Sequence, residues 1–161
     1  MIKRRLPVLF LAVLSAFPAS AATISFLVVE TGLAEGTAAE SSSIWESGLM
    51  DVFFDAGHIV SNAPVLRLSG EPDKPLPDEA RGSFDEALEG GADFFVLALL
   101  EFQGPRDNPK PRRVSLRLFT TRPCRFIYEE QVDGSPPAAQ AEEFAAAQKA
   151  ARTIVSRLRD Q

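Results

Sequence analysis

The chain has 161 residues, and its 22 Asp and Glu against 17 Lys and Arg give a formal net charge of −5. This acidic balance disfavours binding to nucleic acid or to an anionic membrane, because both repel a negatively charged surface. The single cysteine, Cys124, excludes a disulfide bond within the chain.

Residues 1–21 have the pattern of a secretory signal peptide. Residues 3–5 are basic, residues 6–17 form an apolar run, and Ala19-Ser20-Ala21 supplies the small residues that signal peptidase requires. The apolar run is shorter than the ~20 residues that span a bilayer. We therefore expect cleavage after Ala21, which releases residues 22–161 as a single periplasmic or secreted domain without stable insertion in the membrane.

The hydrophobic periodicity and the turn residues of this domain predict the element order β-α-β-α-β-β-β-α. The expected ranges are strand 23–29, helix 43–56, strand 58–68, helix 78–89, strand 92–102, strand 113–120, strand 124–132 and helix 138–159. The fold class that follows is α+β, α/β-like in the loose sense, with a single mixed sheet of about five strands and three helices.

Local signals define several of these elements more closely. Ser43-x-x-Glu46 has the pattern of a capping box that opens the first helix, and Gly57 is suited to end it. Pro64 interrupts the second strand, which predicts an edge position because proline donates no ladder hydrogen bond. The unbroken apolar run 94–100 predicts a central strand that is covered on both faces.

The strands 113–120 and 124–132 are expected to pair as a hairpin. Apolar residues alternate with mostly polar ones over 114–119, which is typical of a half-exposed strand. We expect Cys124 to be buried in the second strand of the hairpin, since exported compartments oxidise exposed thiols. The apolar stripe of the last helix is expected at Phe144, Gln148, Ala151, Ile154, Val155 and Leu158.

No residue pattern predicts a catalytic, cofactor or metal site. Gly32-x-x-x-Gly36 lies between a strand and a helix, but the Lys and Ser or Thr of a phosphate loop are absent. His58 is the only histidine, and we expect a structural role for it at the start of a strand. Glu30 and Glu101 both lie at strand ends, where paired carboxylates can perform acid–base chemistry. Acidic residues are also common at such ends without any catalytic role.

Candidate partner-binding residues lie on the first helix and in the loop of residues 103–112. They are Trp45, Met50, Phe54, Arg106 and Lys110. The three helix residues lie outside the main apolar stripe, so they either pack beneath neighbouring elements or form a patch for a partner. The loop is either a solvated hairpin tip or a second contact.

Three segments carry a resemblance to a group of bacterial envelope proteins. Gly91-Ala92-Asp93 precedes an apolar strand, Val114-x-Leu116-Arg117-Leu118 forms the next strand, and residues 120–128 supply a turn and a further strand. This pattern resembles the curli-secretion channel protein, the outer-membrane activator of penicillin-binding proteins and the amino-terminal domain of the Tol–Pal periplasmic protein. The chain differs from that group in having Arg122-Pro123 where a Thr-Gly pair is usual, and in lacking the lipoprotein cysteine. The resemblance implies a fold and no individual functional residue.

These observations predict an exported envelope domain that acts by protein–protein contact, as a non-enzymatic accessory or adaptor with an envelope protein as its partner. The alternative is a small-ligand-binding protein or a hydrolase. That alternative requires Glu30, His58 and Glu101 to converge in one pocket, whereas the adaptor hypothesis requires an accessible surface on the first helix. The sequence specifies neither the partner nor the oligomeric state.

Overall fold

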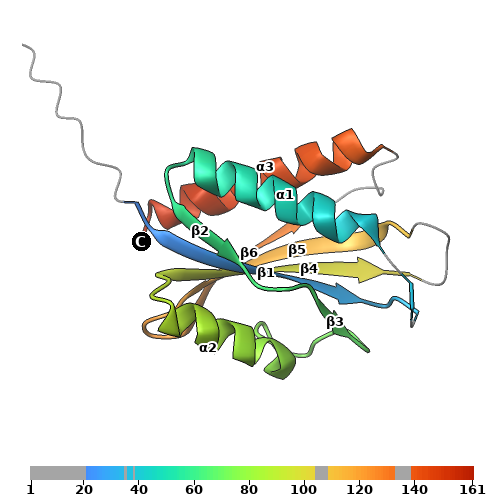
Figure 1. Cartoon of the computed structure of the whole chain (residues 1–161), viewed down its shortest axis with the longest axis horizontal. Coiled ribbons are helices and arrows are strands. Elements are labelled where there is room, and N and C mark those ends of the chain that lie inside the picture. The colour runs from blue at the N-terminus through green and yellow to red at the C-terminus, as the bar shows by residue number, and fades with distance from the viewer. Residues whose placement is uncertain (1–20, 35, 38, 104–108, 133–138) are drawn as a thin grey trace, which may run out of the picture.

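The computed structural model describes residues 21–34, 36–37, 39–103, 109–132 and 139–161 (Figure 1). Its elements in chain order are β1 (Thr23–Thr31), α1 (Glu40–Asp55), β2 (Ile59–Asn62), β3 (Leu66–Leu68), a short 3-10 helix (Asp78–Ala80) that continues into α2 (Arg81–Glu89), β4 (Phe94–Phe102), β5 (Pro111–Thr120), β6 (Arg125–Val132) and α3 (Gln140–Leu158). This order confirms the sequence prediction, with the second strand divided into β2 and β3. The expected signal peptide lies outside the described residues except for Ala21.

The strands form one mixed sheet in the order β2-β1-β4-β5-β6, and β3 also pairs with β1. β1 runs parallel to β2, β3 and β4, whereas β5 is antiparallel to both of its neighbours, β4 and β6. Helices α1 and α3 cover one face of the sheet and α2 covers the other (Figure 1). The predicted α+β class with a single mixed sheet is confirmed.

The two faces of the central strands supply two separate hydrophobic clusters. Along β1, Phe26 and Val28 point toward α1 and α3, while Leu27 and Val29 point toward α2. In β4, every residue from 95 to 100 is buried. Unbroken apolar runs occur in these two strands because both of their faces are covered.

β2 and β3 lie end to end along one edge of the sheet. β2 pairs with the first four residues of β1, and β3 pairs with residues 29–31. Pro64 lies in the gap between them, as expected for a residue that cannot donate to a ladder. The opposite edge is β6, which pairs with β5. The sheet therefore has one interrupted edge and one continuous edge.

The first helix starts one turn earlier than the capping-box pattern predicts. α1 begins at Glu40, and its N-cap residue, Ala39, makes no side-chain cap. Ser43 and Glu46 lie inside the helix, where the Glu46 carboxylate accepts a hydrogen bond from Asn62 Nδ2 at 3.1 Å. In place of a local cap, Ser42 in the first turn of α1 donates a hydrogen bond to Glu30 of β1.

The end of α1 follows the prediction. Gly57 has a φ of +85°, its N–H donates to the Phe54 carbonyl at 2.8 Å, and the His58 N–H donates to the Phe53 carbonyl at 3.2 Å. This pair of bonds is a Schellman arrangement, in which glycine adopts the left-handed conformation without steric cost. The resulting turn directs the chain into β2.

α1 and α3 approach closely because small residues meet at their contact. A Cβ built on Gly48 would lie 2.6 Å from the Cβ of Ala147. On α3, Ala147 and Ala150 are buried, whereas two residues of the predicted stripe, Phe144 and Gln148, are only half-buried. The buried stripe is therefore rotated toward the alanines, since this contact has no room for larger side chains.

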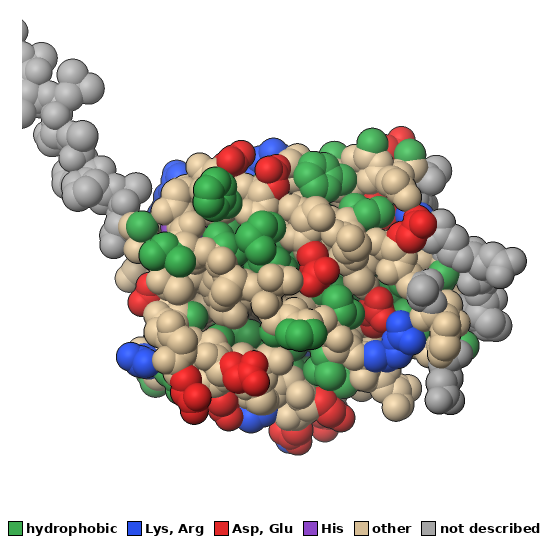
Figure 2. Space-filling model, in the orientation of Figure 1, with side chains coloured by type: hydrophobic (Ala, Val, Ile, Leu, Met, Phe, Trp, Pro, Cys, Tyr) green, Lys and Arg blue, Asp and Glu red, His purple; other side chains and the backbone are tan. Residues whose placement is uncertain are grey.

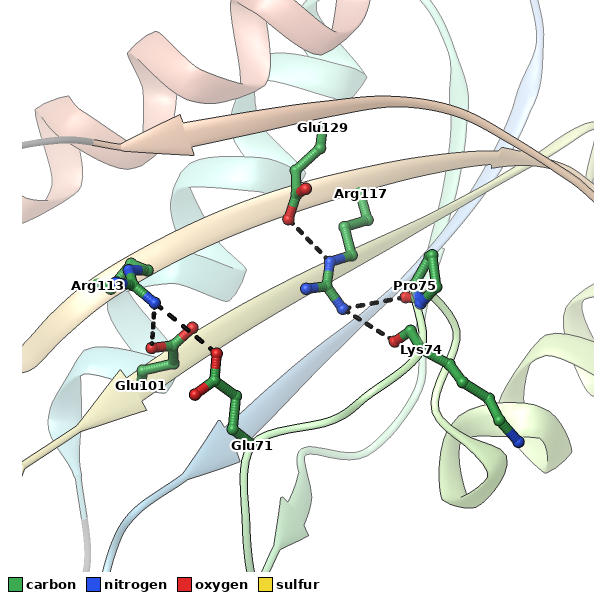
Figure 3. A network of polar contacts seen from close by, with 7 residues as sticks. All are labelled: Glu71, Lys74, Pro75, Glu101, Arg113, Arg117 and Glu129. Atoms are coloured by element: carbon green, nitrogen blue, oxygen red, sulfur yellow. Dashed lines mark hydrogen bonds and ion pairs between the residues drawn. The ribbon is translucent and has the colours of Figure 1, made fainter.

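The prediction that β5 is half-exposed is wrong. Ser115 and Phe119, on its supposedly open face, are only 3% and 2% exposed. The loop between β3 and α2 comes down onto this face, where Arg117 Nη1 donates to the carbonyl oxygens of Lys74 and Pro75, each at 3.2 Å (Figure 3). A polar residue of β5 thus binds a distant loop, which the alternation within one strand does not reveal.

The expected burial of Cys124 is also wrong. Cys124 is exposed, and it lies in the turn of residues 121–124 that joins β5 to β6. Its Sγ accepts a long hydrogen bond from Arg81 Nη1 at 3.8 Å. β6 begins one residue later than predicted, at Arg125, so Cys124 has no face of the sheet against which to pack.

Replacement of Gly48 by alanine tests the contact between α1 and α3. The added Cβ overlaps Ala147, so we expect the free energy of unfolding to fall by about 1 kcal/mol or more. Gly82→Ala on α2 is the matched control, because nothing lies within 4 Å of a Cβ built there. In that open helical position alanine should stabilise the protein by up to about 1 kcal/mol. Urea unfolding that gives both variants the same sign contradicts the close contact.

Candidate functional site

The C-terminal end of β1 carries a pocket of about 490 Å³. Ligands of parallel sheets usually bind at this end of the strands, where successive connections leave toward opposite faces. Here α1 lies on one face and α2 on the other. The lining residues are Glu30, Ala39, Ser42, Ser43, Glu46, Val65 and Arg67. The first turn of α1 contributes to the lining, so the partial positive charge of a helix N-terminus lies at the pocket.

Glu30 is the buried charged residue of this pocket, with 4% of its surface exposed. Ser42 Oγ donates to its Oε1 at 2.5 Å, and Arg67 donates to its Oε2 from Nε at 3.0 Å and from Nη2 at 2.6 Å. Both carboxylate oxygens are therefore engaged by groups of the protein itself. Glu30 thus connects β1 to α1 and to β3. This arrangement does not suit a general base, because a general base needs a carboxylate oxygen that is available to the substrate.

The alternative of a strand-end acid–base site requires a convergence that the structure does not contain. In the register of β1 and β4, Glu101 lies opposite Thr31, one residue beyond Glu30. The side chains of Glu30 and Glu101 therefore project from opposite faces of the sheet. His58 lies beside Ala22 at the other end of β1, roughly 26 Å along the strand from Glu30. The three side chains do not share a pocket.

Trp45 and Lys110, two of the predicted partner-binding residues, meet at a buried carboxylate instead. Glu143, in the first turn of α3, is 0% exposed. Its Oε1 accepts from Trp45 Nε1 at 3.2 Å, and its Oε2 accepts from Lys110 Nζ at 2.7 Å. Trp45 is itself only 2% exposed, so it belongs to the core and not to a surface. Lys110, which directly precedes β5, thus connects this part of the chain to α3.

The other predicted residues of α1 lie at or near the surface. Phe54 is 70% exposed, and Met50 is half-buried against the core. Figure 2 shows hydrophobic side chains gathered over α1 and β2 on this side of the molecule. Arg106 lies outside the described residues. Binding of a partner at these residues stays a prediction.

Arg67 and Glu143 are charged residues whose roles the sequence analysis missed. Glu143 carries a detectable signal, because it lies one turn before Ala147 on the buried stripe of α3, and an acidic residue on such a stripe needs a partner. Arg67 carries no comparable signal. Its pairing with Glu30 depends on β3 lying beside β1, which no local pattern specifies.

Within the described ranges, no group of three or more His, Cys, Asp and Glu is placed to hold a metal ion. Among the helices that the structure describes, none is both long and apolar enough to cross a membrane.

No family model matches the chain, and no curated protein matches it in sequence. Several solved structures are similar to it. The PelC dodecamer from Paraburkholderia phytofirmans is 12% identical, with 81% of this chain and 84% of that chain covered and a TM-score of 0.49. A PelC variant dodecamer from the same organism is 13% identical, with 81% of this chain and 86% of that chain covered and a TM-score of 0.50. The LpoB C-terminal domain from Salmonella enterica is 11% identical, with 71% and 84% covered and a TM-score of 0.34. At this identity, the likeness to the PelC variant shows the fold alone.

Replacing Lys110 with methionine tests the buried carboxylate. The change leaves Glu143 buried without its ion-pair partner, so we expect the free energy of unfolding to fall by about 2–4 kcal/mol. The double variant Lys110→Met, Glu143→Gln removes the unpaired charge and should recover most of that loss. Lys74→Met is the control, because it breaks the exposed ion pair with Asp78 and should have little effect. Equal effects of the two lysine variants in urea unfolding would show that Glu143 does not depend on Lys110.

Proposed function

We propose that this protein is an exported domain of the bacterial envelope that binds another protein, without catalysis, through the edge formed by α1, β2 and β3. The signal-peptide pattern and the resemblance to envelope proteins support the location. The distribution of exposed hydrophobic residues is the observation that carries the contact surface.

Three of the four large hydrophobic residues that are exposed in the described part of the chain follow this one edge. Phe54 on α1 is 70% exposed, Ile59 at the start of β2 is 64% exposed, and Val65, just before β3, is 39% exposed. The fourth, Phe126, lies on β6. The first three do not share one face: Val60 packs against the cluster beneath α1, so Ile59 projects from the other face of β2. Single exposed hydrophobic residues are ordinary, but several that flank one edge are typical of a contact surface. We call Phe54, Ile59 and Val65 the α1–β2 edge surface.

The chemistry of this surface indicates the kind of partner. β2 has four residues and β3 has three, so the interrupted edge presents few backbone groups for strand addition. Contact through side chains is therefore favoured. Asp51 and Asp55 are exposed on α1 beside Phe54, which suits a partner with an apolar patch and a basic rim.

The surface also suits a second copy of this chain. The PelC variant, which shares the fold, is a dodecamer. An experiment on the α1–β2 edge surface therefore has to separate self-association from binding to a different protein.

Site-specific photo-crosslinking in the envelope tests the proposal. A photoreactive phenylalanine analogue at position 54 is expected to give a light-dependent adduct, whereas the same analogue at position 126 gives none. An adduct with twice the mass of the chain identifies a second copy, and any other mass identifies a different protein. Because Phe54 is 70% exposed, Phe54→Asp should leave unfolding unchanged and weaken the contact about tenfold or more. No adduct at position 54, or equal adducts at both positions, contradicts the proposal.

A further inference from the structure

The amino end of β1 holds the only histidine in an arrangement that the proposed contact does not use. The Ala22 N–H donates to His58 Nδ1 at 3.2 Å, and the Ala22 carbonyl accepts from the Ile59 N–H at 3.0 Å. His58 directly precedes β2, so both bonds tie the residue before β1 to the neighbouring strand. A ring nitrogen that accepts a hydrogen bond is unprotonated, and the imidazole is therefore neutral.

Ala22 is also the residue that follows the predicted cleavage position. Hydrolysis of the peptide bond between Ala21 and Ala22 by signal peptidase consumes one water: the Ala21 carbonyl becomes a carboxylate, and the Ala22 nitrogen becomes an amine that takes up the released proton. All described strands and helices lie after this bond, since β1 begins at Thr23. The nitrogen that donates to His58 is thus the nitrogen that cleavage converts into the new terminus.

We propose that His58 is a binding site for the mature amino terminus, in which the α-ammonium of Ala22 donates to His58 Nδ1 and fixes the start of β1 against the start of β2. The inference rests on the exported character proposed above, because it takes cleavage after Ala21 as its starting point. Ala22 is half-buried, so the remaining ammonium hydrogens reach water and the charge stays solvated.

The charges around this site suit an ammonium beside a neutral imidazole. Burial first, and the positive charge of Arg159 second, lower the pKa of His58 below its ordinary 6.5. Arg159 follows α3, whose end lies beside the start of β1 (Figure 1). Asp93, before β4, accepts from the Thr23 N–H at 2.8 Å and puts a negative charge one residue from the terminus. Asp55, at the end of α1, lines the same groove as Arg159.

The direction of the His58 shift defines a pH window for this contact. Because the folded state lowers the pKa, the unfolded chain binds the proton more readily, and neutral His58 contributes stability that is fully present above about pH 6.5. That contribution is lost as the pH falls through the folded pKa. Protonation also turns Nδ1 into a donor, which repels the ammonium. The ordinary pKa of an α-amino group is near 8, so the contact between ammonium and neutral imidazole forms from the lowered pKa of His58 up to about pH 8.

Two chains that differ by one residue test the proposal. The first starts at Ala22, and the second starts at Ala21, so that Ala22 keeps its N–H but the positive charge moves one residue away. His58 is the only histidine, and its NMR titration therefore needs no assignment. We expect a lower His58 pKa in the Ala22 chain, because the ammonium at Nδ1 opposes protonation of the ring. Its terminal amine should also react with an acylating reagent about three to ten times more slowly, the effect of one hydrogen bond.

Equal His58 pKa values in the two chains overturn the proposal, and so do equal acylation rates. His58→Ala in the Ala22 chain should raise the acylation rate to that of the Ala21 chain, with circular dichroism as the check that the variant folds. If that variant does not fold, the comparison of the two unmodified chains still decides. Sequencing of the exported protein tests the premise separately: a start other than Ala22 rejects this inference and leaves the crosslinking result at position 54 unaffected.

Discussion

The rest of the structure depends on the pairing of β1 along both of its edges. β2 and β3 bind one edge and β4 binds the other, all three parallel to β1. Parallel neighbours cannot be joined by a tight turn, so each needs a crossover connection. Crossovers are right-handed, and the chain adds strands first on one side of β1 and then on the other. α1 and α2 therefore lie on opposite faces, and β1 is buried between them.

Burial on both faces confines the polar chemistry of β1 to its two ends. Inside the strand a charged side chain would lose its water without gaining a partner. At the C-terminal end, the buried carboxylate of Glu30 has partners in Ser42 of α1 and Arg67 of β3. At the other end, Ala22 bonds to His58 and Thr23 bonds to Asp93. The groups that form hydrogen bonds with the polar atoms at the ends of β1 thus also connect the neighbouring elements to it.

Features that follow from a local constraint could be predicted from the sequence. The apolar runs of β1 and β4, the gap at Pro64 and the turn at Gly57 are of this kind. Features that depend on distant pairing could not be predicted. Trp45 packs in the core, and its N–H is satisfied there by the Glu143 carboxylate on α3, a residue 98 positions away. The same holds for the candidate site. The sequence predicts that Glu30 lies at a strand end, but it does not predict the ion pair with Arg67.

The two sheet edges limit how this domain can associate with another protein. The register between β5 and β6 shifts between Leu118 and Phe119 of β5, which leaves Ile127 of β6 as an extra residue without a partner on β5. Such a bulge and the neighbouring charges of Glu129 and Glu130 oppose pairing with another strand. The other edge is interrupted at Pro64, and the chain that leaves the ladder there presents Val65 to solvent. The interruption that weakens this edge for strand addition therefore supplies part of its apolar surface, which favours recognition by side chains on α1 and β2.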